Sequence, residues 1–319
     1  MKALVTGATG FVGSALCARL TASGAEVVPA VRNPSGLPHE VAVGNLDAST
    51  DWRLALTGCN AVVHLAARVH VMDGTAHNPL ALYRATNLDA TLNLARQAAQ
   101  AGVKRFVFIS TIKVNGEGRD TPYRETDAPA PDDAYAISKW EAEQGLQQIA
   151  ADTGLGVVIL RPPLVYGPGV KANFLRLMQM VHKGWPLPLG AIRNRRSLLY
   201  LGNFVDAIRL CVEHPDAAGQ TFLLDDGEPV STPQLIRALA RAMGRPARLP
   251  AVPVGVLELA GALLGKRAAV ARLTGSLYVD GSAIRSHLGW VPPFSMEAGL
   301  AATVAGLNSC SSYTSKVKY

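Results

Sequence analysis

The feature that most constrains the fold is a glycine-rich turn almost at the start of the chain. It joins an apolar run at 2–6 to a helical pattern at about 11–23, and its sequence is Thr6-Gly-Ala-Thr-Gly-Phe-Val-Gly13. Glycines at such a junction permit a tight turn, close approach of the backbone to a pyrophosphate and close packing of the helix on the sheet. The strand, the turn and the helix together predict a dinucleotide-binding unit.

The alternation of strand and helix patterns continues through the first half of the chain. Apolar, β-rich runs and helical patterns follow one another, the runs at about 26–31, 40–43, 61–65, 104–110 and 156–161 and the helices at about 79–101 and 132–153. Strands that are apolar along their whole length are covered on both faces, as in a parallel sheet with helices on each side. We therefore expect an α/β fold with a doubly wound parallel sheet.

The second half has a different texture. Prolines cluster at 162–168 and near 186, and short helical patterns follow at about 172–183, 203–214, 232–243 and 253–264. We expect residues 1–166 to form the dinucleotide-binding lobe and 167–307 a smaller, mostly helical lobe, with 196–214 returning to the first. The segment 308–319 loses all periodicity and is expected to be a disordered tail.

Composition narrows the class of protein. With 319 residues, of which 49% are hydrophobic and 17% charged, the chain has the material for a core and should fold. The net charge of +7 favours anionic partners, but the basic residues are scattered and no nucleic-acid motif accompanies them, so nucleic acid is not expected as a partner.

The cysteines and the apolar segments indicate the cellular compartment in which the protein is expected. The four cysteines, at 17, 59, 211 and 310, lie far apart, which argues against a disulfide framework and against a thiolate metal site. No signal peptide precedes the first strand, so we expect a cytoplasmic protein without a metal. The apolar stretch 251–265 is too short to span a bilayer and predicts a buried or partner-facing helix.

The end of the second predicted strand bears on the cofactor. An acidic residue there would bind the adenosine ribose of NAD, but Val31 occupies that position and Arg32 follows it. A guanidinium suits a 2′-phosphate, so we favour NADP over NAD, although a solvated surface arginine is a common alternative. Asn45 could face the adenine edge or could simply belong to a turn.

The candidate chemistry lies in a Tyr-x-x-x-Lys pair. Tyr135 and Lys139 share one face of a predicted helix, so the ammonium could stabilise a phenolate and lower its pKa from about 10 towards neutrality. Ser110 and Thr111 end an apolar strand, at the sheet edge where ligands of open α/β folds bind. A hydroxyl there could hold a carbonyl oxygen, or it could merely end the strand.

Asn87 lies on the apolar stripe of the helix predicted at 79–101. A buried amide needs hydrogen-bond partners. It could bond the backbone of a neighbouring strand and be purely structural, or it could help to position the lysine through water.

Together these pieces resemble the extended short-chain dehydrogenase/reductase superfamily, in its nucleotide-sugar epimerase and dehydratase branch. The resemblance covers about residues 1–300 and rests on the glycine turn, His64-Leu-Ala-Ala67, Asn87, Ser110-Thr111, Tyr135 with Lys139, and Arg161-Pro-Pro-Leu-Val-Tyr-Gly-Pro168. It implies a Rossmann fold, a catalytic triad of Thr111, Tyr135 and Lys139, and support of the lysine by Asn87. The cofactor residues that it implies are Gly7, Thr9, Gly10, Phe11, Val12, Gly13, Arg32, Asn45, Leu46, Leu65, Ala66, Ala67, Ser110 and Pro162.

The resemblance also implies a substrate side and partners. Asn173 is similar to the family asparagine that contacts the diphosphate or sugar, and Arg196 to the arginine that reaches the diphosphate. Arg272 is a further candidate, although the loop spacing around it departs from the family pattern. The expected partners are a UDP-sugar and a second copy of the chain, bound through the helices near 79–101 and 132–153. The apolar helix near 253–264 could instead mark a second interface or contact with a membrane-bound glycosyltransferase.

Two departures from the family separate the reactions. Nucleotide-sugar 4,6-dehydratases carry Asp-Glu after the threonine, where this chain has Ile112-Lys113, and fucose-synthase-like enzymes carry a cysteine at the strand end, where it has Ser110-Thr111. Two reactions remain, 4-epimerisation and reduction of a 4-keto sugar. Because no acidic residue ends the second predicted strand, we expect NAD(P)H-dependent reduction of the 4-keto group of a UDP-4-keto-6-deoxy-N-acetylhexosamine, by similarity to the enzymes that make UDP-N-acetylquinovosamine for surface polysaccharides. The alternatives are a UDP-sugar 4-epimerase with tightly bound NAD and, more remotely, a non-catalytic dinucleotide sensor or RNA-binding relative.

Overall fold

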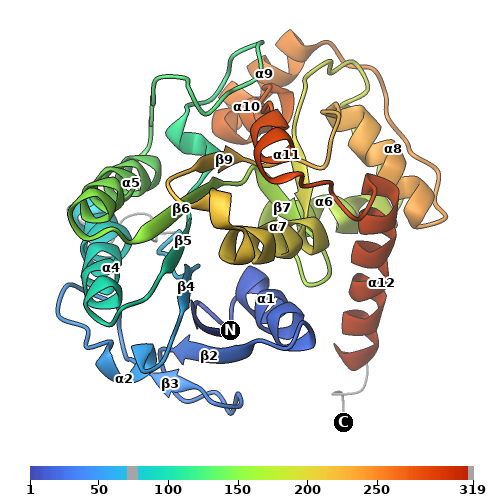
Figure 1. Ribbon diagram of the computed structural model, residues 1–319. Coiled ribbons are helices and arrows are strands. Elements are labelled where there is room, and N and C mark those ends of the chain that lie inside the picture. The colour runs from blue at the N-terminus through green and yellow to red at the C-terminus, as the bar shows by residue number, and fades with distance from the viewer. Residues whose placement is uncertain (70–77, 315–319) are drawn as a thin grey trace.

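The first lobe is built on a parallel sheet of seven strands (Figure 1). The structure is a computed structural model of the chain and describes residues 1–69 and 78–314. In spatial order the strands are β3 (Val41–Ala42), β2 (Glu26–Val31), β1 (Lys2–Thr6), β4 (Ala61–His64), β5 (Arg105–Ile109), β6 (Gly156–Arg161) and β9 (Thr221–Leu223). Strand order reverses direction between β1 and β4, and the carboxyl ends of strands at such a point border the ligand crevice of open α/β sheets.

Helices cover both faces of the sheet because its strands alternate between two cores. Ala3 and Val5 of β1 pack into a core with α1, α7 and α11, whereas Leu4 packs into a core with α2, α4 and α5. These helices are α1 (Phe11–Ala22), α7 (Leu201–Glu213) and α11 (Ser282–Leu288) on one face, and α2 (Arg53–Leu56), α4 (Ala90–Gln100) and α5 (Ala134–Thr153) on the other. The predicted doubly wound parallel sheet is confirmed.

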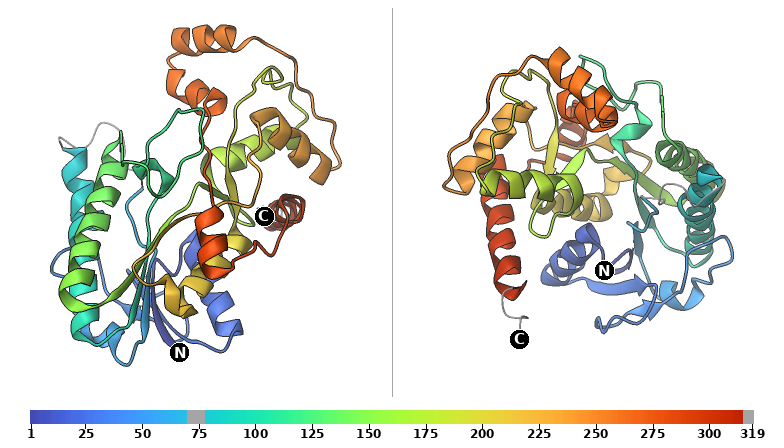
Figure 2. Two further views of the ribbon diagram at one scale, coloured as in Figure 1. Left: turned by 45° about the horizontal axis from the view of Figure 1, so that its top comes forward. Right: turned by 180° about the vertical axis from the view of Figure 1, so that it is seen from behind.

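The second lobe is mostly helical and holds a separate core (Figure 2). A small parallel pair, β7 (Leu164–Tyr166) and β8 (Leu198–Tyr200), connects it to the first lobe. Its helices are α6 (Ala172–His182), α8 (Thr232–Ala242), α9 (Val254–Leu263), α10 (Arg267–Thr274) and α12 (Met296–Thr314).

Three later segments of the chain pack with the first lobe. Helix α7 lies against α1, β9 extends the sheet beside β6, and α11 contributes Ile284 and Leu288 to the core around β1. Helix α7 falls within 196–214, the stretch that was expected to return to the first lobe. The other two carry no sequence signal, because β9 is only three residues long and α11 only seven.

Two expectations about helices differ from the structure. The stretch 79–101 contains α3 (Pro79–Arg84), a π-helical segment (Ala85–Asp89) and then α4, because one wide turn interrupts the α-helical hydrogen bonding. For the helix near 253–264, expected to be buried or partner-facing, the structure excludes the buried alternative: Gly261 is the only fully buried residue of α9, which packs mainly against α10. The partner-facing alternative stays a prediction.

The chain end also differs from expectation. Residues 308–314, expected to be disordered, continue α12, whereas 315–319 lie outside the described residues. Within the described ranges, no helix has both the length and the apolar character to cross a membrane.

Candidate active site

The glycine turn packs directly against the end of β4. Gly7 has a positive φ of 67°, and the N–H of Gly10 donates to its carbonyl oxygen at 2.9 Å. A Cβ on Gly7 would lie 3.0 Å from the backbone nitrogen of Ala66, and one on Gly13 would lie 2.1 Å from the Gly7 oxygen. Only glycine therefore permits both approaches, and the turn at 7–13 packs against the 64–67 segment.

A buried histidine joins the two strand ends. Thr6 Oγ1 accepts the N–H groups of Leu65 and Ala66 and lies 2.7 Å from His64 Nδ1, so its own hydrogen is directed to that nitrogen. His64 Nε2 then donates to Thr91 Oγ1 at 3.0 Å. Burial lowers the pKa of His64 to about 3, with Lys139 adding to the effect, so the ring is neutral and serves as a fixed hydrogen-bond link.

The features around the glycine turn suit an anionic dinucleotide. Helix α1 begins at Phe11 with neither a side-chain cap nor an acidic residue in its first turn, so its N-terminal N–H groups and dipole can favour a phosphate. Val31 at the end of β2 is buried and Arg32 is exposed. Asn45 is exposed, and its backbone carbonyl accepts a hydrogen bond from the Thr50 hydroxyl at 3.2 Å. Contact of its side chain with the adenine stays a prediction.

The other predicted cofactor residues surround the same edge. Leu46, Leu65, Ala66 and Ala67 are half-buried, and Thr9 is exposed beside the turn. Pro162 follows β6, and its carbonyl accepts the N–H of Ile112 at 3.1 Å, which fixes the stretch after β5 against β6.

An ion pair fixes the Thr111 loop to the start of α5. Thr111 caps a short 3₁₀ turn over Ile112–Val114, its hydroxyl accepting the N–H of Lys113 at 3.3 Å. Lys113 Nζ lies 2.8 Å from a carboxylate oxygen of Asp133, whose other oxygen accepts the N–H of Ala136 and caps α5. The lysine at the position of a dehydratase carboxylate therefore has a structural partner.

Tyr135 and Lys139 lie one turn apart on α5, at the carboxyl edge of the sheet. The Tyr135 ring meets that of Tyr83 edge-on, with ring centres 6.1 Å apart. Lys139 is buried, with Nζ 4.0 Å from the centre of the Phe108 ring of β5. The 3₁₀ turn after Thr111 packs on α5, so the Thr111 loop and the helix that carries Tyr135 and Lys139 are neighbours where β5 ends.

The expected fall in the tyrosine pKa is wrong for this structure. Burial raises the pKa of Tyr135 to about 12, and Asp133 and Tyr83 add to the rise. Burial lowers the pKa of Lys139 to about 7, against the opposing charge of Glu143. The phenol is therefore protonated near neutral pH, and the lysine carries its charge only in part.

A buried ion pair that sequence reasoning missed lies beneath Lys139. Glu143, one turn along α5, binds Arg161 of β6, with Nη2 to Oε2 at 2.5 Å and Nε to Oε1 at 3.0 Å. Ser110 donates to the same carboxylate, and Arg161 Nη1 donates to Asn115 Oδ1 at 2.9 Å. The Ser110 hydroxyl is thus held by Glu143 rather than aimed outwards.

Asn87 is fully buried in the π-helical segment and bonds both backbone and side chain. Its Oδ1 accepts the N–H of Arg68 at 2.8 Å, and its Nδ2 donates to the Arg68 carbonyl and to Ser138 Oγ, each at 3.0 Å. Its own carbonyl accepts from Thr91. Among the described residues, Asn87 bonds Ser138, the residue next to Lys139, rather than the lysine, and its role beside the lysine stays a prediction.

The predicted substrate residues lie in the second lobe. Arg196 Nη1 donates to the carbonyls of Arg272 and Gly275, at 2.8 and 3.0 Å, and burial lowers its pKa. Arg196 and Arg272 are therefore neighbours, although the Arg272 side chain is exposed. Asn173 is exposed in the first turn of α6.

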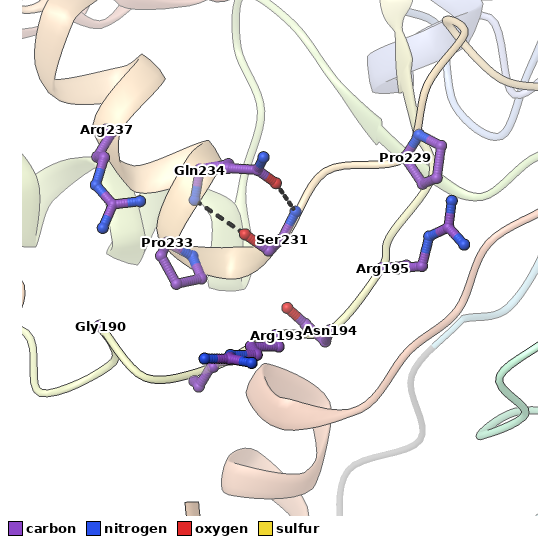
Figure 3. Close-up of a pocket in the computed structure, with 10 residues that line it drawn as sticks. Gly190, Arg193, Asn194, Arg195, Pro229, Ser231, Pro233, Gln234 and Arg237 are labelled. Carbon is purple, nitrogen blue, oxygen red and sulfur yellow. Dashed lines mark hydrogen bonds between the residues drawn. The ribbon is translucent and has the colours of Figure 1, made fainter. Parts of the chain in front are cut away.

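A pocket of about 440 Å³ is lined by residues of the segment 190–195, which precedes Arg196, and by the start of α8 (Figure 3). Arg193 and Arg195 lie on one side of it, and Arg237 and the Ser231–Gln234 capping box of α8 on the other. It does not include Thr111, Tyr135 or Lys139. Its arginines favour an anionic ligand.

The residues that sequence reasoning missed are charged or ionisable groups at the ends of buried strands. His64 and Arg161 each close an apolar strand, and Glu143 follows Lys139 by one helical turn. A polar side chain that ends a fully apolar run is the signal that could have identified them, because such a group needs a buried partner.

Comparison with known proteins links this geometry to a family. Residues 3–224 match the model of the NAD dependent epimerase/dehydratase family. Over 308 residues the chain is 49% identical to a Vibrio cholerae protein named UDP-glucose 4-epimerase, covering 94% of this chain and 93% of the relative. It is 28% identical to a 3-beta-hydroxysteroid dehydrogenase of Mycolicibacterium neoaurum, covering 94% and 89%.

A solved structure with bound ligands is also similar. MoeE5 in complex with UDP-glucuronic acid and NAD superposes with a TM-score of 0.77 at 28% sequence identity, covering 97% of this chain and all of that one. The likeness extends through both lobes.

Proposed function

Because the chain belongs to the NAD dependent epimerase/dehydratase family, we propose that it is a nicotinamide-dependent 4-epimerase of a UDP-hexose. The broad expectation of an NAD(P)-dependent oxidoreductase or epimerase acting on a nucleotide sugar is confirmed by this membership and by the names of the relatives. The reductase favoured on sequence grounds is less well supported than its alternative, since the relative at 49% identity is named UDP-glucose 4-epimerase.

The observation that carries the proposal is the position of Lys139, whose Nζ lies over Phe108 of β5 and close enough to His64, at the end of β4, to lower its pKa, with Tyr135 one turn earlier on α5. Hydride transfer from carbon 4 and back to it is the chemistry that a nicotinamide supplies when bound. In its phenolate form, which is the minor form near neutral pH, Tyr135 Oη would take the proton of the 4-hydroxyl and later return it. Thr111 would hold the oxygen of carbon 4, and Lys139 would stabilise the phenolate.

The residues present fit a dinucleotide. The glycine turn leaves no room for a Cβ at Gly7 or Gly13, and the start of α1 is uncapped by any side chain. Arg196 and the arginine-lined pocket support a substrate with a diphosphate. Which dinucleotide binds is a separate proposal: we favour NADP, because the exposed Arg32 follows the buried Val31, where an acidic residue would bind the ribose of NAD.

A second candidate is reduction of a 4-keto sugar, and two observations favour it. The pKa of Tyr135, near 12, keeps the phenol protonated, as a proton donor to a ketone requires. An exposed arginine at the end of β2 suits NADPH, which a reductase must exchange after every turnover.

The two functions separate in one experiment. The purified protein is incubated with UDP-glucose, and separately with NADPH and a UDP-4-keto-6-deoxy-N-acetylhexosamine, and the sugars and absorbance at 340 nm are followed. Formation of UDP-galactose without net oxidation of cofactor supports the epimerase. Stoichiometric oxidation of NADPH by the keto sugar, without epimerisation, supports the reductase.

A matched pair of variants tests the site. We expect Tyr135→Phe to lower kcat by about 10²–10⁴-fold, because the proton acceptor is lost. Tyr83→Phe removes a hydroxyl that touches the Val69 carbonyl, and it should keep most of the activity. Unchanged turnover in Tyr135→Phe would remove the tyrosine from the mechanism.

A further inference from the structure

Helices α9 and α10 form a hairpin at one extremity of the second lobe (Figure 2). The hairpin carries a group of exposed apolar side chains. Val256, Leu259 and Leu263 are 54%, 63% and 80% exposed, and Leu264 is 71% exposed. Positions 256, 259 and 263 share one stripe of the helix. A cluster of exposed large apolar side chains marks an interaction surface.

The exposure belongs to a packed helix rather than to a loose one. Gly261 packs closely on Val270 of α10, where a Cβ on the glycine would come within 2.6 Å of that side chain. Val254 and Leu257 pack against the core of the second lobe. The hairpin is therefore anchored on one side, and the stripe faces away from the anchor.

The hairpin is also basic. Residues 254–274 hold three basic side chains, Lys266, Arg267 and Arg272, and one acidic one, Glu258, a net charge of +2. Four further arginines at 237, 241, 245 and 248 lie in α8 and in the segment between α8 and α9. Lys266 and Arg267 are exposed and directly follow Leu263 and Leu264 at the turn of the hairpin.

We propose that this hairpin binds the surface of a membrane that contains anionic lipids. The apolar stripe would enter the boundary between headgroups and acyl chains, while Lys266 and Arg267 bind headgroup phosphates. With ten residues, α9 is about 15 Å long, half the thickness of the hydrocarbon core, so it lies in the surface and does not cross it.

Charge separates this partner from a second copy of the chain. Two hairpins that met face to face would bring together two segments of charge +2, with Lys266 and Arg267 beside the stripe in each, and these repel each other. An anionic bilayer supplies both an apolar layer and the opposite charge.

Flotation with vesicles tests the proposal without any substrate. The full-length protein should float with vesicles of phosphatidylethanolamine and phosphatidylglycerol, and not with phosphatidylcholine vesicles, and added NaCl should weaken the binding. The double variant Leu259→Gln with Leu263→Gln should bind at least about tenfold more weakly, because two apolar side chains are lost from the contact. Lys266→Glu with Arg267→Glu should also lose binding.

A matched control removes equally exposed apolar side chains elsewhere. Leu54 and Val291 are 76% and 74% exposed and lie outside the hairpin, so Leu54→Gln with Val291→Gln should float like the unaltered protein. The substituted side chains are all exposed, and melting curves should confirm that every variant is folded. The proposal is overturned if the unaltered protein does not float, or if the leucine variant floats equally well. Conversion of a dimer to a monomer by the leucine variant, with no flotation of the unaltered protein, would assign the stripe to self-association instead.

Discussion

At the residue scale, Lys139 has a proposed role in the active site, and its burial destabilises the folded protein. Its side chain is buried, and its pKa falls from 10.5 to about 7. A lysine with a lowered folded-state pKa destabilises the folded chain fully below pH 7, where both states hold the proton, and the effect disappears as the pH rises towards 10.5. Burial of the group therefore opposes folding under acidic and neutral conditions.

We expect Lys139→Met to be more stable than the unaltered protein and inactive. The gain should be roughly 2–4 kcal/mol at pH 6 and should shrink above pH 7. Urea denaturation at several pH values measures it, and Lys104→Met, at an exposed lysine, is the control without a pH-dependent gain. A gain that stays constant from pH 6 to 10 would show that the lysine is not buried with a lowered pKa.

Arg32 decides the proposed cofactor preference. Its guanidinium is exposed beside buried Val31, and no ion pair engages it within residues 1–69 and 78–314. We expect Arg32→Ala to weaken NADPH binding by about tenfold and to leave NADH binding nearly unchanged, because only NADPH carries the 2′-phosphate. Fluorescence titration of the reduced cofactors measures both affinities, and equal losses would remove the 2′-phosphate role.

Single residues show where sequence reasoning ends. The glycines, Tyr135 and Lys139 were predicted because their spacing along the chain is itself the signal, and Thr111 because the resemblance to the family implied it. The Glu143–Arg161 pair was not, because its members are 18 residues apart in different elements and meet only when α5 packs on the sheet. The pKa of Tyr135 was predicted in the wrong direction, since burial of the phenol cannot be judged from the distance to one lysine.

At the scale of elements, α5 carries two ion pairs in opposite environments. Glu143 and Arg161 are almost entirely buried, whereas Glu141 binds Arg84 of α3 with both side chains partly exposed, Nε to Oε2 at 2.8 Å. A buried charge that loses its partner is costly, and an exposed one is not. The two glutamates therefore form a matched pair on one helix.

We expect Glu143→Gln to lower the free energy of unfolding by about 3–5 kcal/mol, because the guanidinium of Arg161 keeps its charge without a counter-charge. Glu141→Gln should cause a much smaller loss. Chemical denaturation of both variants measures the difference. Similar small losses in the two would mean that the Glu143 site is open to water.

The long elements were predictable, and the short ones were not. Strands β1, β2 and β6 and helices α1, α5 and α8 fall within two residues of their predicted ranges, because each repeats its pattern over several residues. Strand β9 has three residues and is defined by pairing with β6, some sixty positions earlier, which no local pattern reports. The π-helical segment was missed because one added residue leaves the apolar spacing almost unchanged.

At the scale of the whole molecule, the first lobe is not a contiguous piece of chain. Phe204 and Ile208 of α7, Phe222 of β9 and Ile284 of α11 are buried in the same core as Val5 of β1. We expect a fragment of residues 1–166 to lack a cooperative thermal transition, because one face of its sheet is left uncovered. Calorimetry of the fragment beside the full chain tests this, and a sharp transition in the fragment would contradict it.

The chain crosses between the two lobes several times, and this affects how such proteins can evolve new substrate specificities. A genetic crossover transfers one contiguous stretch, but the second lobe is encoded in separate stretches around 164–200, 230–278 and 296–307, with α7, β9 and α11 between them. A crossover would therefore import half of a foreign core along with any new specificity. New substrates are more readily acquired in this architecture by point substitutions in the existing lobe than by exchange of the lobe as a module.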